Sequence, residues 1–213
     1  IVQNEDGSRD ALELKSISEY KAAKIIDGVT PLPAAHNLMQ AMLYKYYLSQ
    51  TEQGKQLHVD NVYLMYINRS NGMTFFYRVD LDEEGWPIIT AFDFNGEQKF
   101  EINLKEVPSF SDLWNRSEVS TSDEARLAEL KINIKDIFDR FDSVYDFTTN
   151  KMLPECDFKL VYDMEDIERE YKLGRISKIK YNKAKKGEPL GDSKCMYCAF
   201  KVKCMKDSGI TFK

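Results

Sequence analysis

The sequence lacks any apolar run that approaches the roughly 20 residues of a membrane-spanning helix. It also lacks an apolar leader, because its first ten residues are mostly polar and acidic. Neither internal repeats nor low-complexity tracts occur. These absences argue against a membrane partner, a secreted protein and a repeat array, and they predict a cytoplasmic globular chain.

An excess of positive charge is absent as well, since the net charge is −5 at pH 7. This argues against a protein coated in basic surface, but a local basic patch is enough to bind nucleic acid. The 213 residues, 43% hydrophobic and 31% charged, fit one large domain or one domain with an appendage. The chain opens on Ile1-Val2 instead of Met, which predicts a fragment or a processed product.

Turn signals and apolar periodicity predict alternating strands and helices. Asp6-Gly7 separates two strand-like runs at 1–3 and 11–16 and predicts a β-hairpin. Helices are expected over 19–26 and 36–48, strands over 62–67, 74–79, 87–94 and 98–104, and an amphipathic helix with Ser122 as N-cap over 123–141. The last two strands are expected to extend the sheet or to form a small second one.

The first strand after the hairpin carries one acid and one lysine two residues apart, Glu13 and Lys15. On a strand these two side chains project from the same face, and Leu12 and Leu14 project from the other. A carboxylate can hold Mg²⁺, and an ammonium can orient a water or stabilise charge on a phosphate. The pair is the minimal equipment of a metal-dependent phosphodiesterase site. The alternative is an ordinary strand with a surface ion pair, because such a triplet also arises by chance in many proteins.

Two further groups of polar residues stand out. His36, Gln40 and Tyr44 recur at helical spacing and share one face of the helix over 36–48. Residues 171–186 include seven lysines and arginines and no acid. This stretch is either a solvated helix or a phosphate-contacting patch, for which Lys178, Lys180 and Lys183 are the candidate DNA contacts.

Cysteine is scarce but clustered near the C-terminus. Cys195, Cys198 and Cys204 form a C-x2-C-x5-C pattern, and Cys156 lies well upstream. In a chain without a secretion signal, such a cluster favours metal or iron–sulfur ligation over disulfides.

Glu13-x-Lys15 on a strand, Gln40-x3-Tyr44 on the next helix and the cysteine pattern together resemble the PD-(D/E)xK nuclease superfamily. The chain looks most like RecB-like and phage-type exonucleases and their CRISPR-associated relatives. The resemblance implies an α/β, restriction-endonuclease-like mixed β-sheet flanked by helices, with a cysteine-ligated metal extension. It implies a nuclease core with inserted β-hairpins over 1–150, its N-terminal part missing, and a basic, cysteine-bearing extension over 151–213.

The resemblance also implies a role for each motif residue. Glu13 would bind Mg²⁺ or Mn²⁺, and Lys15 would position or activate the attacking water. Gln40 and Tyr44 would hold Lys15 or the DNA backbone. His36, one turn before Gln40, would touch phosphate; the alternative is a helix-start residue with no ligand role.

The same relatives use a further aspartate and a [4Fe–4S] cluster. Two carboxylates are needed to fix the catalytic metal well, yet only Asp6 and Asp10 precede Glu13, and neither suits a partner strand. The expected aspartate therefore lies upstream of Ile1. The implied cluster ligands are Cys156, Cys195, Cys198 and Cys204; Zn²⁺ is the competing metal, and a cysteine ahead of Ile1 is an alternative fourth ligand.

The first hypothesis is a Mg²⁺- or Mn²⁺-dependent DNA exonuclease for DNA processing or recombination in a bacterial, archaeal or phage-infected cell. Its candidate protein partners are recombination, replication or CRISPR proteins. The second is a catalytically inactive nuclease-fold module that binds DNA or serves as a structural part of a larger complex. The third is a zinc-stabilised interaction domain in which the nuclease motifs are coincidences.

Overall fold

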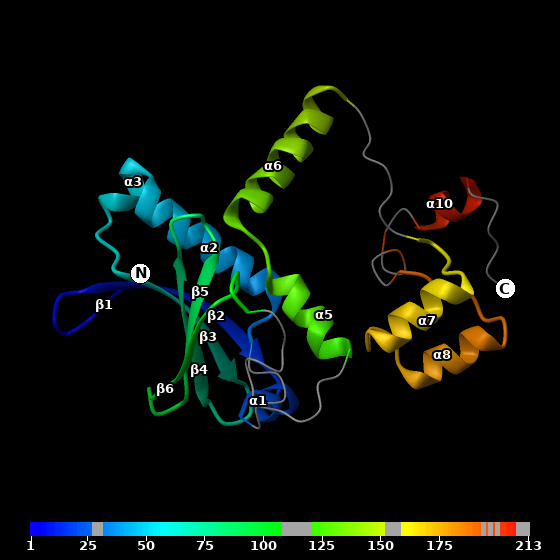
Figure 1. The fold of residues 1–213 in the computed structure, drawn as a ribbon, viewed down its shortest axis with the longest axis horizontal. Helices are drawn as coiled ribbons and strands as arrows, with labels where there is room; N and C mark the ends of the chain where they lie inside the picture. The colour runs from blue at the N-terminus through cyan, green and yellow to red at the C-terminus, as the bar shows by residue number, and fades with distance from the viewer. Residues whose placement is uncertain are drawn as a thin grey trace. The chain divides into compact units, whose positions relative to one another are not determined.

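The computed structural model describes residues 1–26, 32–107, 121–151, 159–192, 195, 198 and 201–207. Its centre is a six-stranded sheet with the order β1-β2-β3-β4-β5-β6 (Figure 1). The strands are β1 (Val2–Gln3), β2 (Arg9–Ile17), β3 (Asn61–Asn68), β4 (Thr74–Leu81), β5 (Pro87–Phe92) and β6 (Gln98–Asn103). β2 and β3 are parallel and the other neighbours antiparallel. The protein is thus α/β with one mixed sheet, and the last two strands extend that sheet.

The described helices lie in the sequence between β2 and β3 and after β6. They are α1 (Glu19–Ile26), α2 (Ala35–Gln50), α3 (Glu52–Lys55), α5 (Thr121–Leu130), α6 (Ile134–Thr149), α7 (Met164–Lys172), α8 (Lys178–Lys185) and α10 (Lys201–Asp207). The chain divides into two compact units: Ile1–Val119 with Arg126–Val144, and Ser120–Ala125 with Tyr145–Lys213. Among the described helices, none is both long and apolar enough to cross a bilayer.

One face of the sheet carries the core of the first unit. Successive residues of β3 alternate between half-buried and buried, as expected for a strand covered on one side. Leu64 and Tyr77, opposite each other on β3 and β4, are almost fully buried. α2 lies against this face (Figure 1) and adds Leu38, Ala41 and Met42 to the core. This packing fixes which face of α2 remains for polar side chains.

The helix expected over 123–141 is in fact two helices, α5 and α6, so that prediction was wrong. Asn133 separates them: its Oδ1 accepts from the backbone N–H of Lys135 at 2.8 Å, and its Nδ2 donates to the Glu84 carbonyl at 2.9 Å. A Cβ on Gly85 would lie 2.4 Å from Ile134, so the start of α6 packs closely on the β4–β5 turn. Ser122 lies inside α5 and is not its N-cap.

The second unit contains α7, α8 and α10. Residues 171–186 form the end of α7 and α8, two helices separated by a turn at Gly174 instead of one. α7 begins with a capping box, in which Asp163 accepts from the Asp166 backbone N–H at 2.8 Å. Asp166 is 1% exposed, and its carboxylate also accepts from Lys159 at 2.6 Å and from Arg169 at 2.7 Å.

This arrangement predicts acid sensitivity of the second unit. The hydrogen bond from Lys159 holds the pKa of Asp166 below its ordinary value. A carboxyl group with a depressed native pKa contributes stability above its unfolded pKa, about 3.9, and that contribution is lost as the pH falls through the native pKa. Asp166→Asn should therefore raise the rate of amide hydrogen exchange in α7 at neutral pH. The exchange rates of the variant and wild type should become similar as the pH is lowered, because wild type then loses the contribution of the Asp166 carboxylate. Glu168→Gln, exposed on the same helix, is the control and should change little.

Candidate functional site

The parallel pairing of β2 with β3 determines what lies next to Lys15. In this register Lys15 is opposite Tyr66. The Tyr66 hydroxyl accepts a hydrogen bond from the backbone N–H of Ala34 at 3.1 Å and another from Asn37 Nδ2 at 2.9 Å. Asn37 is buried, so these bonds satisfy polar groups where water does not reach. They attach the start of α2 to β3 beside Lys15, and one turn later α2 presents Gln40.

A continuous polar chain links the strand to the helix. Lys15 Nζ lies 2.5 Å from Glu13 Oε1 and donates to Gln40 Oε1 at 2.9 Å. Gln40 Nε2 in turn donates to the Tyr44 hydroxyl at 2.7 Å. The structure thus brings Glu13, Lys15, Gln40 and Tyr44 together, although β2 and α2 are separated in the sequence. We call these four residues the E-K-Q-Y chain.

The E-K-Q-Y chain runs from a sheltered end to an exposed one. The Glu13 side chain is 14% exposed and that of Lys15 29%, whereas Tyr44 is 38% exposed as a residue. Partial burial reduces the screening of the Glu13–Lys15 attraction by water and salt. Gln40 accepts from the ammonium and so restricts its position. The arrangement can therefore offer a carboxylate oxygen to a cation and a positioned ammonium to an anionic group.

The two acids ahead of Glu13 are engaged elsewhere. Asp10 projects from the opposite face of β2, where it accepts from Asn4 at 2.7 Å and Asn61 at 2.9 Å. Asp6 lies in the hairpin turn; the Ser8 hydroxyl donates to it at 2.6 Å, and this bond lowers the pKa of Asp6. Neither acid shares a site with Glu13, as expected from the sequence.

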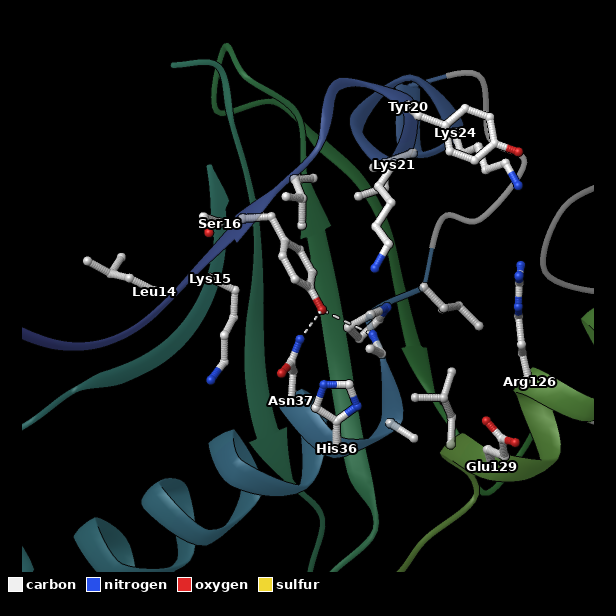
Figure 2. A pocket seen from close by; sticks show the side chains of 18 residues that line it. Leu14, Lys15, Ser16, Tyr20, Lys21, Lys24, His36, Asn37, Arg126 and Glu129 are labelled. Atoms are coloured by element: carbon white, nitrogen blue, oxygen red, sulfur yellow. Dashed lines mark hydrogen bonds between the residues drawn. The ribbon is translucent and has the colours of Figure 1, made fainter. Parts of the chain in front are cut away.

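The other predicted site residues fall into separate places. His36 lines a hollow that also contains Lys15 (Figure 2). Lys178, Lys180 and Lys183 lie exposed on α8, in the second unit, and Lys183 is paired with Glu188 at 3.2 Å. On the same helix Tyr181 stacks on Tyr171 of α7, with ring centroids 4.2 Å apart.

The cysteine cluster is described only in part. Cys195 is buried, Cys198 and Cys204 are exposed, and the Cys198 backbone N–H donates to the Cys195 carbonyl at 3.3 Å. Cys156 lies outside the described residues. Within the described part of the chain, no three His, Cys, Asp or Glu side chains are gathered to hold a metal. The cluster therefore stays a prediction.

Several residues near the site were not identified from the sequence. In the sequence Tyr66 is one aromatic residue of a strand and Asn37 an amide at the start of a helix. The hydrogen bond that joins them is a long-range contact. Lys21 and Lys24 on α1 also line the hollow. Their i, i+3 spacing on a short helix after the triplet was a signal that could have identified them.

Fold and site together define an α/β protein with a carboxylate–ammonium pair at the crossing of a strand and a helix. No family model, curated protein or solved structure matches the chain.

Proposed function

We propose that this chain carries part of the active site of a metal-dependent deoxyribonuclease of the PD-(D/E)xK type, acting as an exonuclease in DNA processing or recombination. The observation that carries the proposal is the E-K-Q-Y chain. Two short motifs that arose by chance would have no reason to share hydrogen bonds across 25 residues of sequence. Instead Gln40 bonds the lysine of the strand triplet, and Tyr44 extends the same network.

Each member of the E-K-Q-Y chain has a role in this proposal. Glu13 supplies one carboxylate for Mg²⁺ or Mn²⁺, whose preferred ligands are oxygens. When bound, the metal supplies electrostatic stabilisation of the phosphate and of the leaving oxygen. Lys15 positions the attacking water or neutralises a phosphate oxygen. Gln40 and Tyr44 fix the ammonium so that little reorganisation is needed at the moment of reaction.

A metal site of this kind needs a second carboxylate, and the hairpin register indicates its position. β1 and β2 are antiparallel, with Val2 opposite Asp10. If β1 continues in this register in a longer protein, the second residue ahead of Ile1 lies opposite Glu13 and projects from the same face. Cβ atoms of such pairs are about 5 Å apart, which suits two carboxylates on one cation. We propose an aspartate or glutamate at that position.

The second unit has two proposed parts. The exposed lysines of α8 would bind the phosphates of the DNA backbone with little base preference. The affinity for DNA should therefore fall steeply as the salt concentration rises. Cys156, Cys195, Cys198 and Cys204 would hold a [4Fe–4S] cluster, with Zn²⁺ as the alternative. Iron, zinc and acid-labile sulfide measured on protein purified without oxygen separate these two metals.

The experiment that tests the proposal is a nuclease assay on the full-length protein, purified without oxygen. End-labelled single- and double-stranded DNA are incubated with Mg²⁺, Mn²⁺ or EDTA. We expect shortening of the labelled strand with either metal and none with EDTA. Intact DNA under every metal condition would contradict the nuclease proposal.

A second candidate function is a catalytically inactive DNA-binding or structural module of a larger complex. The observation that favours it is that the two acids ahead of Glu13 are engaged elsewhere, Asp10 with Asn4 and Asn61 and Asp6 with Ser8. This candidate predicts DNA binding without cleavage in the same assay.

A further inference from the structure

A hollow of about 930 Å³ lies beside the E-K-Q-Y chain (Figure 2). The end of β2, α1, the first turn of α2 and the part of α5 from Arg126 onward surround it. Its volume is within the range of small-molecule sites, about 300–1,000 Å³. Lys15 lines the hollow and is ion-paired with Glu13, so the hollow and the proposed reaction site share one residue.

The charged lining of the hollow is mainly cationic. Lys15, Lys21, Lys24 and Arg126 line it, and Glu129 is the one acid among its described lining residues. Lys24 Nζ lies 4.5 Å from the centroid of the exposed Tyr20 ring. Within the described part of the chain, neither Lys21 nor Lys24 is paired with a carboxylate. Their charges are therefore available to an anion.

Much of the remaining lining is apolar. Ile17, Pro33 and Leu130 are buried there, and Ile25 and Leu32 are half-buried. An inorganic anion would use the lysines but leave this apolar surface uncovered. A ligand that matches both parts has an anionic group joined to a flat, weakly polar body. A nucleotide has this composition, since its phosphate is charged and its base presents an apolar face.

We propose that this hollow binds the terminal nucleotide of a single-stranded DNA end. The terminal phosphate contacts Lys21 and Lys24, and the base and sugar contact Ile25 and Leu32. The next phosphodiester linkage then lies toward Lys15 and Glu13. This inference rests on the nuclease function proposed above, and it adds the form of substrate: a strand end that carries a phosphate.

The test measures binding to the full-length protein in EDTA, where no metal-dependent cleavage occurs. The probes are a fluorescent single-stranded oligonucleotide with a phosphate at either end, the same strand with hydroxyl ends, and a circular single strand. Wild type should bind a strand with a phosphate at one of its two ends more tightly than the hydroxyl-ended and circular strands. Lys21→Ala/Lys24→Ala should weaken that complex about tenfold, the scale of losing a charge-assisted hydrogen bond. For the double variant, the slope of the logarithm of affinity against the logarithm of salt concentration should become shallower by about 0.7 for each phosphate contact removed.

The matched control is Lys55→Ala, an exposed lysine on α3 outside the hollow, which should change affinity less than about twofold. Equal losses for phosphorylated, hydroxyl-ended and circular strands would overturn the proposal, because the lysines would then act as general backbone contacts. The nuclease proposal fails separately. If neither protein cleaves DNA but the double variant loses the wild-type preference for phosphorylated ends, the nucleotide site stands and the nuclease proposal fails. If the protein cleaves DNA but shows no preference for phosphorylated ends, the nuclease proposal stands and the nucleotide site fails.

Discussion

Lys15→Ala is expected to reduce metal-dependent DNA cleavage by about 10²- to 10⁴-fold, the range over which a positioned proton-transfer group contributes to a reaction. The polar contacts of this side chain are to Glu13 and Gln40, and Lys15 is not part of the hydrophobic core cluster. The fold should therefore persist while the ammonium beside the carboxylate is lost. Rates on end-labelled single- and double-stranded DNA with Mg²⁺ and Mn²⁺, measured on the full-length protein, give the result.

Lys45→Ala is the matched control for this variant. Lys45 lies on α2, is also partly buried, and forms an ion pair with Asp80 at 2.6 Å, but it is outside the E-K-Q-Y chain. It should keep wild-type cleavage within a few-fold. Cleavage that persists in Lys15→Ala would assign the activity to another site or to a contaminant. Equal loss in both variants would indicate a damaged fold instead of a missing catalytic group.

Local sequence signals were sufficient for most of the sheet. The strands expected over 62–67, 74–79, 87–94 and 98–104 match β3, β4, β5 and β6, which pair as antiparallel neighbours. A hairpin is determined by residues close in sequence, so a short window contains the signals that form it. The parallel pairing of β2 with β3 is different, because its partners are about 50 residues apart.

The wrong prediction of one helix over 123–141, where the structure has α5 and α6, also results from a contact between residues far apart in the sequence. Leu127, Leu130, Ile134 and Ile137 keep helical spacing across the break and all enter the core, so periodicity alone predicts one helix. The break depends on Asn133 bonding the Glu84 carbonyl, a contact with a distant turn. A tertiary contact of this kind overrides local preference, and no pattern within the helix reports it.

Part of the candidate site could also be predicted from the sequence. The spacing of Glu13 and Lys15 on a strand, and of Gln40 and Tyr44 on a helix, predicted which side chains share a face. The bond between Lys15 and Gln40 depends on where α2 crosses the sheet. That crossing is set by the buried Tyr66–Asn37 bond, which joins two elements far apart in sequence. Spacing within an element therefore predicts a face, and only packing predicts which faces meet.

Leu64→Ala should cost about 2–5 kcal/mol in the free energy of unfolding. Leu64 is fully buried on β3 and lies between Glu13 of β2 and Tyr77 of β4 in the register of the sheet. Truncation removes buried methyl groups and leaves a cavity that neighbouring strands cannot close. Urea unfolding followed by circular dichroism measures the loss, and an unchanged m-value shows that the same surface unfolds.

Leu14→Ala is the matched comparison, because it makes the same truncation on the neighbouring strand but on the opposite face. Leu14 is 54% exposed, so its loss should cost about 0.5 kcal/mol or less. The ratio of the two costs tests which face of the sheet is covered. If Leu14→Ala proves as costly as Leu64→Ala, the outer face is buried in solution beneath another part of the protein. The assignment of a single covered face, the one that carries Leu64 and Glu13, would then be wrong.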